Sequence, residues 1–335
     1  MEKKKIALII DTEGWAFDNI AHQLKNNLTE FDIDIIPGRI FEGNMIKLFL
    51  FGEDYDLIHF LWRGYLTLID RAEMHNYIEA LGMSFEKFKQ KYILNKNITF
   101  SVCDELYLSG DDEWRTEETM KYGKEYFVTS KRLYNIYQQF SKKPQMVIHD
   151  GVDLQKYIPE NLDRFKNIET VRIGWTGNSK FKDSEGDSDM KGVEGIIKPA
   201  IEELQREGYS VELNLADRNI KMIPQEEMPK FYNSIDLYVC ASKTEGTPLP
   251  IIEAMAMGVP VISTDVGIVS EAVGECNKKY ILKERTKEDL KNAIKSIIKN
   301  KQDFEEISKE NIEKVKQWDW KVIAQQYKEF FESNM

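Results

Sequence analysis

The chain has 335 residues, of which 42% are hydrophobic, 31% charged and 11% aromatic. At about 150 residues per domain this length predicts two domains, and the composition excludes a disordered or low-complexity chain. The net charge of −11 is evenly shared, with 19 basic and 24 acidic residues in 1–150 and 27 and 33 in the remainder. This balance argues against a nucleic-acid-binding protein and leaves peripheral membrane contact without support from charge.

The N-terminus and the cysteines bear on where the protein acts. The first apolar run, IALII (6–10), is too short for the core of a signal peptide, and no later stretch reaches the roughly 18 apolar residues of a membrane span. Cys103, Cys240 and Cys276 are too few and too widely spaced to suggest a disulfide framework or a metal site. We therefore expect a cytoplasmic protein.

Short apolar runs alternate with helix-compatible segments through the first half of the chain, which predicts a parallel α/β domain over 1–153. Strands are expected at 6–10, 31–36, 55–62, 98–102 and 125–130, with a further strand running into a turn at 145–153. Helices are expected at 17–28 and 43–51. The interval 70–95 is longer than one crossover requires, and it predicts a helical insertion of two helices.

The segment 154–170 is polar, lacks a clear period and contains Pro159, so we expect an interdomain linker there. The alternation then resumes and predicts a second α/β domain over 171–318. Its expected strands are 171–175, 211–215, 236–242 and 259–264, and its expected helices are 193–207, 224–234, 249–257, 286–299 and 303–316. The last segment, 319–335, is predicted to be an amphipathic helix.

The most informative stretch is SKTEGTPLPIIEAMAMGVPVISTDVG (242–267), which follows a predicted strand. Ligands bind at the carboxyl ends of strands in open α/β sheets. Gly246 allows close approach of a ligand to the backbone, and the helix predicted to begin near Leu249 offers backbone N–H groups to a phosphate. Glu245 and Glu253 are eight residues apart, and carboxylates at such a site suit sugar and ribose hydroxyls.

The prolines beside these carboxylates select the backbone donors. Pro248 and Pro250 have no N–H, so Thr247, Leu249 and Ile251 are left as the expected donors. This local chemistry predicts a site for a diphosphate that carries hydroxylated groups on both sides.

The Glu-x7-Glu pattern within EGTPLPIIEAMAMGVPVIST resembles the signature of glycosyltransferase family 4, the retaining nucleotide-sugar transferases of GT-B fold. Three further segments resemble that family: TDVGIVSEAV, IGWTGNSK with DMKGVEGIIKPAIEEL, and HDGVD (149–153), in which Asp150 replaces the usual asparagine. The resemblance covers most of the chain, strongly over 171–270 and weakly over 1–145.

The resemblance implies a donor site in the C-terminal domain. Glu253 would hold the ribose hydroxyls, Glu245 would reach the transferred sugar, and Lys191 would meet the diphosphate. Asn178 stands where the family has an arginine, and Lys180 either replaces that arginine or is a surface lysine. Arg218 either lies near the base or belongs to an ordinary loop. The implied donor-binding residues are Gly177, Asn178, Ser179, Lys180, Lys191, Arg218, Gly246, Thr247, Leu249 and Glu253.

On the acceptor side, the family's His-Asp pair is replaced by Cys103-Asp104. Asp104 would orient the acceptor hydroxyl or stabilise charge on the sugar, with a structural aspartate as the alternative. His59 would face the same cleft as a catalytic group, or else be satisfied within the core. Arg63 would meet an anionic acceptor.

The loop after the first strand contains Gly14 and Trp15. Trp15 either stacks on a sugar ring or is buried.

The expected fold is α/β, a GT-B arrangement of two facing Rossmann-like domains with parallel sheets, a deep interdomain cleft and a final helix that crosses back to the N-terminal domain. The expected activity is that of a retaining hexosyltransferase without cofactor or metal. It would move sugar from a nucleotide-sugar donor to a glycan, lipid-linked, protein or other hydroxyl acceptor in bacterial surface polysaccharide or glycoconjugate synthesis.

Two alternatives stay open: a nucleotide-sugar epimerase or hydrolase on the same scaffold, and a non-catalytic sugar-nucleotide-binding relative. The Asp-x-Asp at 187–189 lies in a charged loop without a preceding apolar strand, so we do not interpret it as a metal motif. The lack of a Gly-x-Gly-x-x-Gly after the first strand and of a Walker lysine loop removes the usual support for dinucleotide oxidoreduction and nucleotide hydrolysis.

Overall fold

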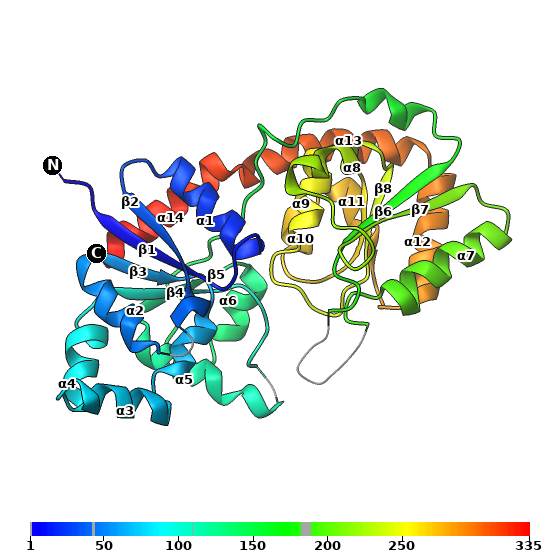
Figure 1. Ribbon diagram of the computed structural model, residues 1–335. Helices are drawn as coiled ribbons and strands as arrows, with labels where there is room; N and C mark the ends of the chain where they lie inside the picture. Colours follow the sequence, from blue (N-terminus) through cyan, green and yellow to red (C-terminus); the bar gives the residue numbers. More distant parts are fainter. Residues whose placement is uncertain (1, 42–43, 109, 182–188) are drawn as a thin grey trace. The chain divides into compact units, whose positions relative to one another are not determined.

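The computed structural model describes residues 2–41, 44–108, 110–181 and 189–335. The chain forms two compact units (Figure 1). The N-terminal unit comprises Met1–Asp150 together with Trp320–Met335, and the C-terminal unit comprises Gly151–Asp319. Each unit contains a five-stranded sheet whose strand pairs are all parallel.

The sheet of the N-terminal unit has the strand order β2-β1-β3-β4-β5. Its strands are β1 (Lys5–Ile10), β2 (Asp32–Pro37), β3 (Leu57–Phe60), β4 (Ile98–Val102) and β5 (Glu125–Val128). Its helices are α1 (Ala16–Asn27), α2 (Ile46–Phe51), α3 (Ala72–Ala80), α4 (Phe85–Lys89), α5 (Trp114–Tyr122), α6 (Lys131–Tyr137) and α14 (Trp320–Asn334). The strand expected at 145–153 is reduced to two isolated bridges, one between Val128 and Val147 and one between Val152 and Asp319.

Strand β1 is buried on both faces, which is why its sequence is a continuous apolar run. Ile6, Leu8 and Ile10 pack into a cluster with α1 and α14. Ala7 and Ile9 point to the opposite face, where a second cluster includes residues of α2, α3, α4, α5 and α6. The helical insertion expected at 70–95 supplies α3 and α4 to that second cluster.

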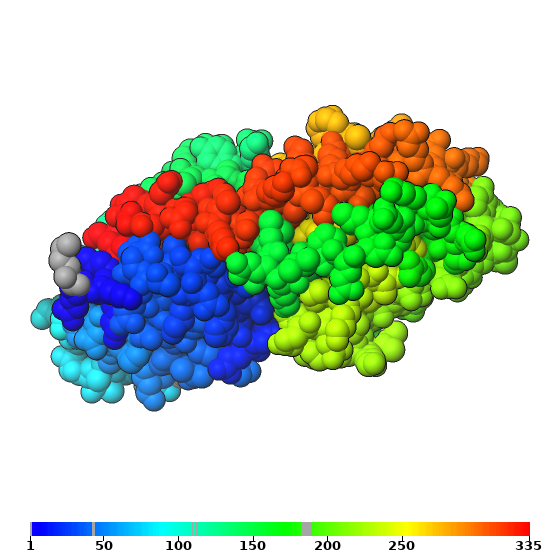
Figure 2. All heavy atoms as spheres, turned by 90° about the horizontal axis from the view of Figure 1, so that it is seen from above, coloured from blue at the N-terminus to red at the C-terminus, as the bar shows by residue number. Residues whose placement is uncertain are grey.

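Helix α14 completes one face of the N-terminal unit. Its buried residues Tyr327, Phe330 and Phe331 belong to the same cluster as Leu24 of α1. Figure 2 shows the red residues of this helix lying on the blue residues of the same unit. Segments at the two ends of the chain therefore share one core.

The sheet of the C-terminal unit has the strand order β10-β9-β8-β6-β7. Its strands are β6 (Val171–Gly177), β7 (Val211–Asp217), β8 (Leu237–Cys240), β9 (Val261–Thr264) and β10 (Ile281–Leu282). Its helices are α7 (Lys198–Arg206), α8 (Met228–Asn233), α9 (Leu249–Ala256), α10 (Val269–Ala272), α11 (Glu275–Lys278), α12 (Lys287–Lys299) and α13 (Gln302–Lys314). A π-helical turn, Val193–Ile197, precedes α7 where the sequence predicts a continuous helix.

Residues 154–170, expected as a linker, belong to the C-terminal unit. Tyr157, Phe165 and Ile168 are buried in its core. Polar residues separate these apolar side chains without a helical or strand period. The sequence pattern therefore gave no sign that the three residues are buried.

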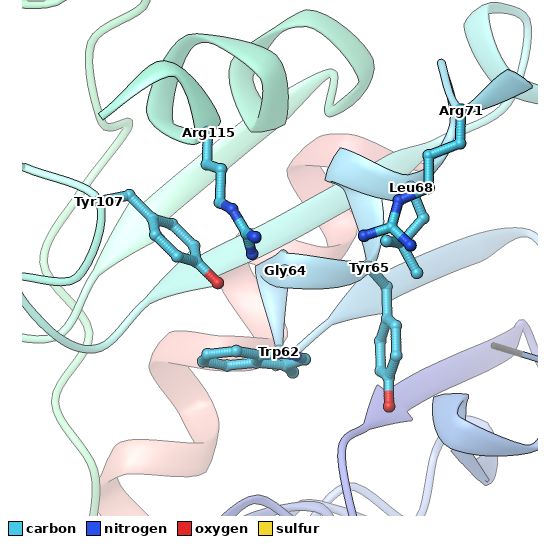
Figure 3. A pocket seen from close by; sticks show the side chains of 7 residues that line it. All are labelled: Trp62, Gly64, Tyr65, Leu68, Arg71, Tyr107 and Arg115. Atoms are coloured by element: carbon cyan, nitrogen blue, oxygen red, sulfur yellow. The ribbon is translucent and has the colours of Figure 1, made fainter. Parts of the chain in front are cut away.

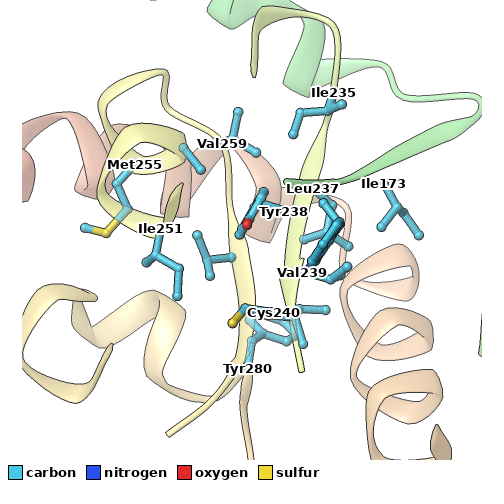
Figure 4. Packing of buried hydrophobic residues seen from close by; sticks show 14 of the residues in the cluster. Ile173, Ile235, Leu237, Tyr238, Val239, Cys240, Ile251, Met255, Val259 and Tyr280 are labelled. Carbon is cyan, nitrogen blue, oxygen red and sulfur yellow. The ribbon is translucent and has the colours of Figure 1, made fainter. Parts of the chain in front are cut away.

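The core of the C-terminal unit is built around β8, whose four residues are all buried. Ile251 and Met255 of α9 lie one helical turn apart and belong to the same buried cluster as the residues of β8 (Figure 4). This packing holds α9 against the sheet directly after the loop that follows β8. In the part of the chain that the structure describes, every helix is too short or too polar to span a membrane.

Candidate functional site

The loops that follow β6, β7, β8 and β9 meet at one edge of the C-terminal sheet, because all four strands are parallel. Strand β6 comes first in this sheet, with β7 on one side of it and β8 on the other. The strand order therefore reverses between β6 and β8, and a crevice at such a reversal is where open α/β sheets bind ligands.

Glu245 lies in the loop after β8 and is held by two groups. Its Oε1 accepts a hydrogen bond from Ser242 Oγ at 2.6 Å and forms an ion pair with Lys191 Nζ at 2.5 Å. The Glu245 and Lys191 side chains are 19% and 20% exposed, so the pair is accessible from solvent yet fixed in place. The structure thus brings together two of the predicted site residues from segments 54 residues apart.

Two glycines allow the loops around this pair to approach each other. Gly267 has a φ of +53°, and a Cβ there would lie 1.9 Å from the carbonyl oxygen of Gly246. Gly192 has a φ of +69°, and a Cβ there would lie 2.5 Å from the carbonyl oxygen of Ala241. Any side chain at either position would collide with backbone, so the two glycines fix the spacing of Lys191 and Glu245.

Arg285, which the sequence analysis did not select, joins the same loops. Its Nε donates to the carbonyl of Ala241 at 2.9 Å, and its Nη2 donates to the carbonyl of Asp189 at 2.5 Å. The guanidinium thereby links the end of β8 to the segment that carries Lys191. No local pattern could have found this residue, because its acceptors are 44 and 96 residues away in the chain.

Glu253, on α9, is surrounded by hydrogen-bond donors. Its Oε1 accepts from Tyr157 Oη at 2.6 Å and its Oε2 from Tyr232 Oη at 2.7 Å, with Gln225 Nε2 3.4 Å from Oε1. Burial, followed by the charge of Glu253, raises the pKa of both tyrosines, so their hydroxyls remain donors at physiological pH. Glu253 Oε2, which accepts from one donor, keeps acceptor capacity for a ligand hydroxyl.

The loops after β6 and β7 are tied together through Asp217. Its Oδ1 accepts from the Ser179 backbone N–H at 3.3 Å and from Asn219 Nδ2 at 2.8 Å. Burial opposes ionisation, but the hydrogen bonds from Ser179 and Asn219 lower the pKa of Asp217 overall. Asn178 joins this network by accepting from Asn219 Nδ2 at 2.7 Å.

The remaining predicted donor-side residues frame this network. Gly177 ends β6, and its carbonyl accepts from the Arg218 N–H at 3.0 Å. Lys180 is exposed beside the network.

The backbone at the start of α9 differs from the prediction. The Leu249 N–H donates to the Thr247 carbonyl at 2.8 Å, and the Ile251 N–H donates to the Pro248 carbonyl at 2.8 Å. The expectation that these two amides face a ligand is therefore corrected, because a tight turn uses them. Thr247 Oγ1, in contrast, is buried and has no hydrogen-bond partner among the described residues, which leaves it available to a ligand.

Of the three residues of the Asp-x-Asp segment, the structure describes only Asp189. Residues 187 and 188 lie outside the described residues. Asp189 Oδ2 accepts from the Gly195 N–H at 2.8 Å, so this carboxylate caps the π-helical turn Val193–Ile197.

In the N-terminal unit, Arg63 follows β3 and is only 2% exposed. It forms an ion pair with Asp104 Oδ1 at 2.8 Å and donates to the Leu106 carbonyl at 2.7 Å. The prediction that Arg63 meets an acceptor is therefore corrected, because its guanidinium holds the loop after β4. Asp104 stays partly exposed, and burial raises the pKa of the neighbouring Cys103 thiol, so this thiol cannot replace a histidine base near neutral pH.

His59 lies on β3 with its ring completely buried. It stacks on Phe127 with ring centroids 5.4 Å apart, contacts Phe331 of α14 edge-on, and its Nδ1 lies 2.9 Å from Thr99 Oγ1. The assignment of His59 as a catalytic group is therefore corrected. Its side chain lies on the face of the sheet that α1 and α14 cover.

We expect His59 to make stability depend on pH. Burial lowers its pKa to about 3, against about 6.5 in an unfolded chain. Because the folded-state pKa is depressed, the stabilisation is present above pH 6.5 and is lost as the pH falls toward 3. Between about pH 7.5 and about pH 5 the loss should be about 2 kcal/mol. The free energy of unfolding, measured with urea, should depend less on pH in His59→Leu than in the wild type. His22→Leu, which removes an exposed histidine, should keep the pH dependence of the wild type. An equal change of the unfolding free energy with pH in all three proteins would refute the assignment of this pH dependence to His59.

Gly14 and Trp15 follow β1. Gly14 has a φ of +74°, and its N–H donates to Asp18 Oδ2 at 2.8 Å. Trp15 is 49% exposed, so its ring lies at the surface and not in the core.

Residues 193–315 match the family model described as glycosyl transferases group 1. The matched segment lies within the C-terminal unit. Glu245, Glu253 and Arg285 all lie inside the matched segment. Lys191 lies just before it and is joined to it through Glu245.

Curated relatives match parts of the chain. The lipopolysaccharide core biosynthesis mannosyltransferase LpsB of Rhizobium meliloti is 46% identical over 59 residues, 18% of this chain and 17% of the relative. Protein CapJ of Staphylococcus aureus is 28% identical over 206 residues, 55% of this chain and 49% of CapJ. The chain thus spans about half the length of CapJ and a smaller part of LpsB.

Solved structures match the whole chain. Sucrose-phosphate synthase from Thermosynechococcus elongatus superposes with a TM-score of 0.69 at 16% identity, covering 99% of both chains. HepE from Anabaena, in complex with UDP and glucose, superposes with a TM-score of 0.69 at 15% identity, covering 98% of this chain and 100% of HepE. At these identities the likeness establishes the fold, and the predicted GT-B fold class is confirmed.

Proposed function

We propose that this protein is a retaining, metal-independent glycosyltransferase that moves a sugar from a nucleotide-sugar donor to a hydroxyl acceptor. The observation that carries the proposal is the arrangement of Glu245, Lys191 and Glu253 at the carboxyl edge of a sheet in a group 1 domain. The names of LpsB and of the teichuronic acid biosynthesis glycosyltransferase TuaC of Bacillus subtilis favour a role in bacterial surface polysaccharide or glycoconjugate synthesis.

In the proposed donor complex, Glu253 accepts hydrogen bonds from the ribose hydroxyls. Two tyrosines already hold its carboxylate in place. Glu245 binds hydroxyls of the transferred sugar, and Lys191 meets the diphosphate. The ion pair between Lys191 and Glu245 suits a ligand in which the sugar is attached directly to phosphate. HepE structures contain UDP and UDP-glucose, so a uridine diphosphate sugar is the first donor to test.

The proposed transfer breaks the bond between the anomeric carbon and the diphosphate oxygen and forms a bond from the acceptor oxygen to the same face of that carbon. The departing phosphate oxygen takes the proton of the acceptor hydroxyl. Negative charge develops on the nucleoside diphosphate, where Lys191 stabilises it. Positive charge develops on the sugar ring, where the carboxylate of Glu245 opposes it.

A panel of nucleotide sugars in a thermal-shift assay tests donor binding, and turnover with and without acceptor then tests the activity. Acceptor-dependent product with retained anomeric configuration, measured by NMR, supports the proposal. Donor turnover without any acceptor would favour an epimerase or hydrolase, and donor binding without turnover would favour a non-catalytic relative.

We expect EDTA to leave transfer largely intact. Lys191 supplies the positive charge that a divalent cation would otherwise bring to the diphosphate. The measurement is the initial rate before and after chelation and gel filtration. Complete loss of activity, restored by manganese or magnesium, would overturn this model of the donor site.

A further inference from the structure

The N-terminal unit contains a pocket of about 250 Å³ at the carboxyl ends of β3 and β4 (Figure 3). Trp62, Gly64 and Tyr65 line it from the segment after β3, and Tyr107 from the loop after β4. The strand order of this sheet reverses between β1 and β3. The pocket lies at the carboxyl edge of the sheet, where open α/β sheets bind ligands, between β3 and β4 and next to this reversal.

The floor of the pocket is aromatic. A Cβ on Gly64 would lie 2.7 Å from Nε1 of the Trp62 indole, so only a glycine allows the indole to lie where it does. The Tyr107 ring is tilted by 55° to the indole with its centroid 6.4 Å away. Both residues are only partly buried, and a flat, partly exposed indole suits the apolar C–H face of a sugar ring.

Two arginines, Arg71 and Arg115, line the pocket. Figure 3 shows the guanidinium of Arg115 extending toward the space above the Trp62 ring and that of Arg71 lying beside Leu68, above the Tyr65 ring. The Arg115 guanidinium lies 5.2 Å from the Tyr107 ring centroid, while Arg71 is exposed next to Asp70, whose own ion pair is with Lys121. Guanidinium forks bind carboxylates and phosphates with paired hydrogen bonds.

The loop that carries Tyr107 is held in a strained conformation. Tyr107 has a φ of +67°, a left-handed conformation that bulky residues rarely adopt. Its carbonyl accepts from Thr116 Oγ1, and Arg63 lies 5.0 Å from its ring centroid while donating to the Leu106 carbonyl. Strain of this kind persists where surrounding contacts fix it, and it is concentrated at ligand sites.

We propose that this pocket binds an anionic saccharide, with the sugar ring on Trp62 and its carboxylate or phosphate between Arg71 and Arg115. The claim that this saccharide is the acceptor rests on the proposed function. The claim that the pocket binds it does not. The assignment moves the recognition of an anionic acceptor from Arg63, which is paired with Asp104, to the two arginines that line the pocket.

The test is ¹⁹F NMR of the full chain labelled with 5-fluorotryptophan, in which Trp62→Phe identifies the Trp62 resonance. Glucuronate, glucose 1-phosphate and methyl glucoside are titrated in turn. We expect glucuronate, glucose 1-phosphate or both to shift this resonance at concentrations where methyl glucoside does not. The double variant Arg71→Gln/Arg115→Gln should raise the dissociation constant by about 10-fold or more, whereas Arg206→Gln, an exposed arginine of α7, should leave it unchanged.

A response to glucuronate alone identifies an acidic sugar, and a response to glucose 1-phosphate alone identifies a sugar phosphate. Equal affinity for methyl glucoside, an equal response to inorganic phosphate, or no shift of the Trp62 resonance would each overturn the inference. Calorimetry with UDP on the same protein reports on the donor site separately. If UDP binds but the Trp62 resonance does not shift, only this inference is refuted. If the Trp62 resonance shifts but no nucleotide sugar binds, only the proposed function is refuted.

Discussion

Replacing Glu245 with glutamine should lower kcat by about 10²-fold or more, the scale of losing one electrostatic stabiliser of a transition state. Glutamine keeps the size of the side chain and can still accept from Ser242 Oγ, but it removes the negative charge beside the transferred sugar. That charge opposes the positive charge that the ring develops, and interactions that strengthen in the transition state lower kcat when they are lost. The affinity for free nucleoside diphosphate should barely change, because Glu253 holds the ribose.

Initial rates and calorimetry on Glu245→Gln separate these two effects. Glu202→Gln is the matched control, because Glu202 is an exposed carboxylate on α7 of the same unit. Lys191→Met adds a double-mutant cycle, since Lys191 Nζ contacts the same carboxylate at 2.5 Å. Intact kcat with lost nucleotide binding would show that the roles of Glu245 and Glu253 are exchanged. Full activity with unchanged binding would place the reaction elsewhere.

Replacing Glu253 with alanine should weaken binding of free nucleoside diphosphate by about 10- to 150-fold, since a hydrogen bond to a charged group contributes about 1.5–3 kcal/mol. The same change leaves the hydroxyls of Tyr157 and Tyr232 without their acceptor. Because Tyr232 is fully buried, we also expect the free energy of unfolding to fall by about 1–3 kcal/mol.

Matched variants distinguish lost ligand contact from lost structure. Tyr232→Phe keeps the carboxylate and removes only one of its donors, so nucleotide binding should persist. Glu253→Gln keeps an acceptor for the tyrosines and should lose nucleotide affinity with a smaller loss of stability. Calorimetry with UDP and urea unfolding are the two measurements. Unchanged UDP affinity in Glu253→Ala would remove this residue from the site.

The order of strands and helices followed from the apolar pattern wherever a strand is buried on both faces. IALII (6–10) became β1, Lys5–Ile10, and the run before the Glu-x7-Glu segment became β8, Leu237–Cys240. Segments with fewer internal contacts were harder to predict. The two-residue strand β10 is too short for any periodicity, and the segment 145–153 forms only two isolated bridges.

His59 shows why exposure could not be predicted from the strand alone. Its position in YDLIHFLW is compatible with either face of the sheet being open. The face is closed by Phe330 and Phe331 of α14, about 270 residues further along the chain. Arg63 is similar, because its burial depends on Asp104 and Leu106, which follow a different strand.

The α/β class of the fold and the positions of Glu245 and Glu253 could be predicted from the amino-acid sequence. Both follow from local order: alternating apolar runs specify parallel strands and helices, and Glu245 and Glu253 are placed by one loop and one helix. The tertiary structure alone decided which groups surround them. Tyr157 precedes β6, Tyr232 lies on α8, and Lys191 and Arg285 follow β6 and β10. Their contacts exist only because packing around one parallel sheet brings these distant segments together.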